Sequence, residues 1–103
     1  MPNATPLTDA DRADLAAASP AWTLSADATA ISRQFKGKNF THAWAFMSAV
    51  AIEAEKLNHH PEWSNVYRTV DIRLTTHDTG GLSNLDAALA GKIDALAATL
   101  GVE

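Results

Sequence analysis

The sequence predicts an α+β domain in which three helices pack on one face of a small antiparallel sheet. Three observations predict it: two long stretches carry apolar residues at helical spacing, a short alanine-rich stretch begins with a helix cap, and alternating, β-branched stretches lie between them. In chain order these elements read α-β-β-α-β-β-α. The 103 residues are enough for one domain, so we expect a single unit over residues 1–103.

The composition is that of an ordinary soluble protein, with 47% hydrophobic and 19% charged residues. No apolar run is long enough for a membrane span, the start does not resemble a secretory signal, and the chain has no cysteine. These features predict a cytoplasmic protein without a membrane partner. The net charge of −4 argues against direct nucleic-acid binding, although Arg33, Lys36 and Lys38 form a small basic group that suits a solvated strand end or an anionic partner.

The first third of the chain predicts a short helix followed by a hairpin. Residues 1–7 are expected to form a flexible tail, and Thr8 can cap a helix that runs to about Ala18, before Ser19-Pro20 ends it. Residues 22–24 then suggest a short strand. The partial alternation over residues 28–35 suggests its antiparallel partner.

The next helix gives the strongest signal. Asn39 or Thr41 can cap it, and an apolar stripe recurs at three- and four-residue steps over more than four turns: Phe40, Ala43, Trp44, Met47, Val50 or Ala51, Ala54 and Leu57. Phe46 and Ile52 lie off this stripe. They indicate either a wide core face or a second face that contacts another subunit, and Pro61 is expected to end the helix.

Residues 65–76 predict one long strand or two short ones, because Arg68 interrupts the apolar alternation. Val66, Val70, Ile72 and Leu74 are expected to share one face. Gly80-Gly81 then predicts a turn, and residues 83–86 resemble a capping box. The last helix carries a stripe of leucine and isoleucine: Leu85, Leu89, Ile93, Leu96 and Leu100.

Three of the four histidines lie between residues 55 and 86: His59, His60 and His77. Such a cluster is typical of proton transfer or metal binding. Adjacent histidines rarely bind one ion, so no metal site is predicted, and no serine lies in a nucleophile elbow. General acid–base chemistry remains, because imidazole, with a pKa near 6.5, can give and take a proton at neutral pH. Glu55 would lie one turn before His59 if the helix extends so far, and could then orient that ring.

The run Glu55-x-x-x-His59-His60-Pro61, followed by Tyr67, His77 and Asp86, resembles the pterin-4a-carbinolamine dehydratase family. Shorter matches add to it: Pro61-Glu62-Trp63, Asn65-Val66-Tyr67, Thr76-His77 and Gly81-Leu82-Ser83, with Trp22 and the long central helix upstream. The likeness extends from about residue 8 to residue 100, and its specific part is residues 55–86.

The resemblance implies a lyase that removes water from a 4a-hydroxytetrahydropterin, as in tetrahydrobiopterin recycling, without a metal or a redox cofactor. It implies that His59 and His77 act as general acids toward the 4a-hydroxyl and that His60 chiefly binds the pterin. Glu55 and Asp86 would orient these groups, and Pro61 and Trp63 would shape the pocket. It further implies a homodimer or homotetramer. Two alternatives stay open: a non-catalytic binding module or transcriptional coactivator that dimerises through the long helix, and a relative acting on another pterin, such as a molybdopterin precursor.

Overall fold

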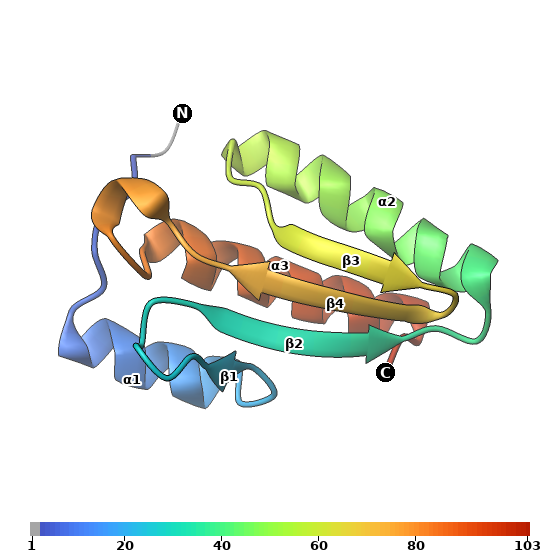
Figure 1. The fold of residues 1–103 in the computed structure, drawn as a ribbon, viewed down its shortest axis with the longest axis horizontal. Coiled ribbons are helices and arrows are strands. Elements are labelled where there is room, and N and C mark those ends of the chain that lie inside the picture. The colour runs from blue at the N-terminus through green and yellow to red at the C-terminus, as the bar shows by residue number, and fades with distance from the viewer. Residues whose placement is uncertain (1–2) are drawn as a thin grey trace.

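A computed structural model describes residues 3–103 and confirms the predicted α+β class (Figure 1). The elements are α1 (Asp9–Ala18), β1 (Thr23–Leu24), β2 (Ile31–Lys36), α2 (Phe40–Leu57), β3 (Glu62–Val66), β4 (Thr69–Leu74), the short 3-10 helix η1 (His77–Thr79) and α3 (Asn84–Leu100). None of the helices in residues 3–103 combines the length and the apolar character that a membrane span requires.

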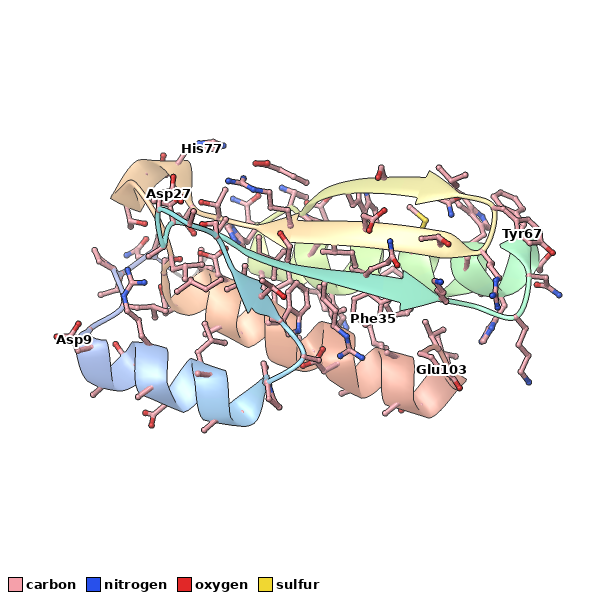
Figure 2. All side chains as sticks on the ribbon, turned by 60° about the horizontal axis from the view of Figure 1, so that its bottom comes forward. Asp9, Asp27, Phe35, Tyr67, His77 and Glu103 are labelled. Atoms are coloured by element: carbon pink, nitrogen blue, oxygen red, sulfur yellow. The ribbon has the colours of Figure 1, made fainter. Side chains whose placement is uncertain are left out.

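The four strands form one antiparallel sheet in the order β1-β2-β4-β3. The helices lie on one side of it, with α2 and α3 behind the sheet and α1 beside α3, and the other face is uncovered (Figures 1 and 2). Alternation places Phe35, Val70 and Ile72 on the helix side, where they are buried. They pack against apolar residues of the helices, including Phe46, Val50, Leu89 and Ile93. Packing in this core determines how α2 and α3 lie against the sheet.

Side-chain caps set the starts of all three helices. Thr8 and Asp11 form a capping box for α1, Asn39 caps α2, and Ser83 and Asp86 form a capping box for α3. The end of α2 differs from the prediction. Asn58 takes the left-handed conformation, with φ 49°, so the helix ends at Leu57, before Pro61 can act.

The strand boundaries also differ in part. The loop after β1 includes Ala28 at φ 61°, and β2 therefore begins at Ile31 instead of residue 28. Arg68 marks a real break, because Tyr67 at φ 52° turns the chain between β3 and β4. Val66 was expected on the face of Val70 and Ile72. That expectation is wrong: Val66 ends β3 and its side chain is exposed.

The flexible tail expected over residues 1–7 is wrong for the part of it that the structure describes, because residues 3–7 are tied to the start of α3, beginning with the Asn3 carbonyl, which accepts from Asn84 Nδ2 at 3.3 Å. Pro6 forms a β-bridge with Ser83, the Thr5 amide donates to Asn84 Oδ1 at 2.7 Å, and the Leu7 amide donates to the Leu82 carbonyl. Residues 1–2, which belong to the same predicted tail, lie outside the described residues. The start of α3 offers these partners only after folding, and sequence periodicity contains no signal for them.

The two off-stripe residues of α2 have opposite environments. Phe46 is fully buried in the core, whereas Ile52 is 59% exposed. Two residues assigned to the core stripe, Phe40 and Trp44, are also exposed and stack on each other. The helix thus has a wide core face that includes Phe46, and an outer face on which Phe40, Trp44 and, two turns further on, Ile52 are exposed.

Candidate active site

The sheet brings the three predicted histidines to one end. The beginning of β3 pairs with the end of β4, with Glu62 opposite Arg73. His59 and His60 directly precede β3, and His77 closely follows β4, so the antiparallel register carries them to the same end of the sheet. Figure 2 shows His77 there, pointing away from the ribbon.

His59 is held by a buried carboxylate. Its Nε2 lies 2.6 Å from Asp86 Oδ1, and the two side chains are 10% and 0% exposed. Asp86 Oδ2 accepts two further hydrogen bonds, from the Thr76 hydroxyl at 2.7 Å and from the Ser83 amide at 2.9 Å. Asp86 is the third residue of α3, where a carboxylate also interacts favourably with the helix dipole. The capping box thus places a carboxylate next to Nε2 of the His59 ring.

Glu55 does not hold His59, contrary to the expectation that it would orient that ring. Because α2 ends at Leu57, the chain turns at Asn58 and His59 points toward Asp86 of α3. Glu55 Oε1 instead lies 3.4 Å from His60 Nε2, and both side chains are largely exposed, at 76% and 59%. An exposed pair at this distance stabilises little, so His60 is free to reorient toward a ligand.

His77 begins η1 and is 89% exposed. Its turn is closed by Gly80, which has φ 70°, a conformation that glycine adopts without strain. The nearest carboxylate is Glu62, whose Oε2 lies 3.8 Å from His77 Nε2 and whose Oε1 accepts a hydrogen bond from Arg73 at 2.8 Å. His77 is therefore an accessible imidazole on a short, well-defined turn.

An open groove on the uncovered face of the sheet reaches this end. Its volume is about 800 Å³, within the range of small-molecule sites. Glu62, Trp63 and Arg73 line it together with residues of β2 and β4. Trp63 is half-buried and also packs against the core, and Pro61 is half-buried just before β3. Glu62 lines the groove and also lies beside His77, so this end of the groove is close to the His77 ring.

The loop between β1 and β2 supports the same end of the sheet. Thr75 donates to the Thr29 carbonyl at 2.7 Å, and Thr29 lies close to Gly81. Hydrogen bonds from the Ser25 hydroxyl, and from the hydroxyl and amide of Thr29, lower the pKa of Asp27 to about 2. Asp27 is therefore ionised throughout the physiological range, and its hydrogen bonds connect Ser25 and Thr29 within this loop.

The arrangement suits proton transfer. One imidazole is buried and oriented by a carboxylate, and two others are exposed at the same end of the sheet. Among residues 3–103, no group of three histidine, cysteine, aspartate or glutamate side chains is placed to hold a metal ion.

Thr76 and Ser83 were not predicted as site residues, yet both contact Asp86. The capping-box pattern gave a signal for Ser83, but only as a helix cap. Thr76 occurred in the sequence analysis only as part of the family match Thr76-His77, and its contact with Asp86 could not be predicted because it depends on the turn that brings α3 back to β4.

Comparisons with known proteins identify the family to which the chain is similar. The model of the family described as pterin 4 alpha carbinolamine dehydratase matches residues 5–96. A relative from Rhizorhabdus wittichii, whose name assigns it provisionally as a pterin-4-alpha-carbinolamine dehydratase, is 56% identical over 92 residues, covering 89% of this chain and 95% of its own.

Two solved structures share the fold. One, described as a transcriptional coactivator/pterin dehydratase from Brucella melitensis, has a TM-score of 0.84 and 41% identity, covering 90% of this chain and 99% of its own. The other is described as a pterin dehydratase-like protein that is a RuBisCO assembly factor in the alpha-carboxysome. It has a TM-score of 0.64 and covers 75% of this chain and 89% of its own, but at 24% identity it shows the fold alone. With the family match spanning residues 5–96, the chain belongs to the pterin 4 alpha carbinolamine dehydratase family.

Proposed function

We propose that this protein dehydrates 4a-hydroxytetrahydropterin to quinonoid dihydropterin and water, as a lyase in tetrahydrobiopterin recycling in the cytoplasm. The observation that carries the proposal is the buried His59–Asp86 pair at the same end of the sheet as the exposed His60 and His77. In this reaction the bond between C4a and the hydroxyl oxygen breaks, the leaving hydroxyl takes up a proton, and the pterin ring loses one. Positioned imidazoles can carry out both transfers.

The role of each histidine in this proposal follows from how exposed its ring is and from which groups hold the ring in place. His59 and His77 serve as general acids toward the 4a-hydroxyl, the first held by Asp86 and the second free to approach the substrate. His60, whose ring is exposed and only weakly held by Glu55, contributes mainly to binding the pterin. Glu55 acts on His60, and we assign Pro61, just before β3, and Trp63, which lines the groove, to shaping the pocket.

The direct test is an assay of purified protein on 4a-hydroxytetrahydropterin generated in situ. The expected result is dehydration well above the uncatalysed rate, with saturation by substrate. A rate equal to that of buffer, from a protein with normal circular dichroism, would reject the proposal. Parallel measurements with other pterins, including molybdopterin precursors, decide whether the substrate is a different member of this class.

Chelation should leave the activity unchanged, because the proposed acids are imidazoles and the proposed reaction is not a redox step. The measurement is the dehydration rate after EDTA or phenanthroline treatment and removal of the chelator by gel filtration. An untreated sample passed through the same column is the control. Loss of activity that added zinc restores would contradict catalysis by the histidines alone.

The outer row of α2 supports a second proposal, that the protein forms a homodimer or homotetramer through this helix. Trp44 is 57% exposed and stacks on the exposed Phe40, and Ile52 on the same helix is 59% exposed. Contiguous exposed apolar side chains of this kind mark interaction surfaces. This surface is also the one that a binding module or coactivator would use. The dehydration assay separates the two functions, since a module without activity would fail it.

Replacing both Trp44 and Ile52 with glutamate should shift the mass measured by light scattering toward smaller species. The reason is that the substitutions place charges in the apolar contact without disturbing the core. Ala17→Glu, at an exposed position of α1, is the control for added charge and should leave the mass unchanged. Phe46 is unsuitable for this test because it is fully buried, and a charge there would unfold the chain. A monomeric wild type, or an unchanged mass of the double variant, would contradict assembly through α2.

A further inference from the structure

A chain of hydroxyl groups lies beneath the His59–Asp86 pair. Thr76 Oγ1 is 2.7 Å from Ser83 Oγ and 2.7 Å from Asp86 Oδ2. Ser83 Oγ in turn accepts from the Leu85 amide at 3.2 Å. Thr76 is 6% exposed, and Ser83 and Asp86 are fully buried. Water therefore does not complete these contacts, and the protons must be shared among the side chains and backbone amides themselves.

The number of available protons determines which group donates in each of these hydrogen bonds. An ionised carboxylate can only accept, so the single hydroxyl proton of Thr76 is directed to Asp86 Oδ2. Thr76 Oγ1 then has no proton left for Ser83, and Ser83 must donate its own hydroxyl proton to Thr76. The sequence of donation is Leu85 N–H to Ser83, Ser83 to Thr76, and Thr76 to Asp86. Every hydroxyl in it is used both as a donor and as an acceptor.

The consequence is a defined state of His59. With Oδ2 of Asp86 occupied by Thr76 and by the Ser83 amide, Oδ1 is the oxygen that faces Nε2 of His59 at 2.6 Å. Nε2 must carry the proton in this bond, because Oδ1 has none to give. The neutral ring therefore has its lone pair on Nδ1, and Nδ1 is the atom at which His59 can take up a proton and return it.

Thr76 also anchors the turn of His77. Its amide donates to the Gly81 carbonyl at 3.2 Å, and its carbonyl accepts from the Gly81 amide at 3.1 Å. The Thr79 hydroxyl donates within the same turn. The side chain of Thr76 thus supports His59 through Asp86, while its backbone closes the loop that presents His77.

We propose that Thr76 is a positioning residue whose hydroxyl, acting through Asp86, holds His59 in the tautomer with the proton on Nε2 and the lone pair on Nδ1. The part of this inference that concerns catalysis rests on the proposed dehydration. The part that concerns the tautomer does not, because it can be measured without any substrate.

The first experiment is nitrogen-15 NMR of the histidine rings in the wild-type protein above the pH at which they are protonated. The expected result is a protonated Nε2 and an unprotonated Nδ1 for His59, assigned by comparison with His59→Ala. The opposite tautomer would overturn the proposal. This measurement needs no variant of Thr76, so it decides which tautomer His59 adopts even if such a variant fails to fold. It also remains valid if the protein shows no dehydratase activity, which would reject the proposed function alone.

The second experiment compares three variants. Thr76→Val keeps the shape but removes the hydroxyl, and should lower kcat by about 10- to 100-fold with KM changed less than about 3-fold, as is usual for groups that orient a reacting ligand. It should also shift the His59 ring signals in the NMR spectrum, because Asp86 Oδ2 then keeps only the hydrogen bond from the Ser83 amide and Oδ1 is held less firmly toward Nε2. Thr76→Ser restores the hydroxyl and should recover most of the activity. Thr75→Val is the matched control, because it removes a neighbouring hydroxyl that donates to the Thr29 carbonyl and not to Asp86.

A double-mutant cycle tests whether Thr76 acts through His59. In the His59→Ala background, Thr76→Val should lower kcat by less than about 3-fold, because the ring that it positions is gone. An equal loss in both backgrounds would show that Thr76 acts by another route. A Thr76→Val enzyme with the same kcat as Thr75→Val would likewise contradict the proposal.

Discussion

Replacing His59 and His77 together with alanine should bring the dehydration rate close to the uncatalysed one, whereas His77→Ala alone should lower kcat by about 10- to 1000-fold. The two rings come from different segments and have separate supports, Asp86 for His59 and the η1 turn for His77. Loss of one should therefore leave the other in place. Steady-state kinetics on the single and double variants, with folding checked by circular dichroism, gives the result.

Two other histidine variants serve as comparisons. His60→Ala should raise KM more than it lowers kcat, because this ring is exposed and is assigned to binding. His42→Ala should leave kcat unchanged and lower the free energy of unfolding by about 1–2 kcal/mol. His42 lies away from the site, where its Nδ1 accepts from the Lys38 amide and its Nε2 donates to the carbonyl of Leu100. A well-folded double variant of His59 and His77 with near wild-type turnover would show that this assignment of roles is wrong.

The fold could be predicted to a large extent because its signals are local. The capping boxes of Thr8 and Ser83 and the apolar periodicity of α2 and α3 depend on residues within a few turns of one another. The predicted element boundaries are wrong where the backbone takes a conformation that these local sequence patterns do not indicate. Ala28, Asn58 and Tyr67 all adopt positive φ, and each ends or delays an element at a place that hydrophobic periodicity does not mark.

Candidate residues of the site could be named from the sequence, but which of them contact one another could not. The resemblance to the family supplied His59, His60, His77, Glu55 and Asp86, and spacing along a helix suggested that Glu55 would orient His59. The structure joins Asp86 to His59 over 27 positions of sequence, because the left-handed Asn58 turns the chain toward α3. A pair at this separation is a property of the folded chain, and periodicity within one helix cannot reveal it.

In the proposed mechanism, Asp86 supports both the stability of the fold and proton transfer by His59. Its two oxygens receive three hydrogen bonds, from His59, Thr76 and the Ser83 amide, and the side chain is fully buried. Asparagine has the same size but only one acceptor oxygen, and its NH₂ group would face a donor. At least one buried donor would then be unsatisfied, which costs about 1–3 kcal/mol, and the loss of an anion at the start of a helix adds about 0.3–1 kcal/mol.

We therefore expect Asp86→Asn to lower the free energy of unfolding by about 2–4 kcal/mol and kcat by about 100- to 10,000-fold, since the carboxylate no longer orients the His59 ring. Urea unfolding and steady-state kinetics measure the two effects. Asp94→Asn is the matched control on the same helix: Asp94 accepts from Trp22 at 2.8 Å and from Arg33 at 2.7 Å, outside the site. It should lose about 1–2 kcal/mol of stability and keep its kcat. If Asp86→Asn lost stability but kept wild-type kcat, Asp86 would be a helix cap with no part in the chemistry, and His59 would need another source of its orientation.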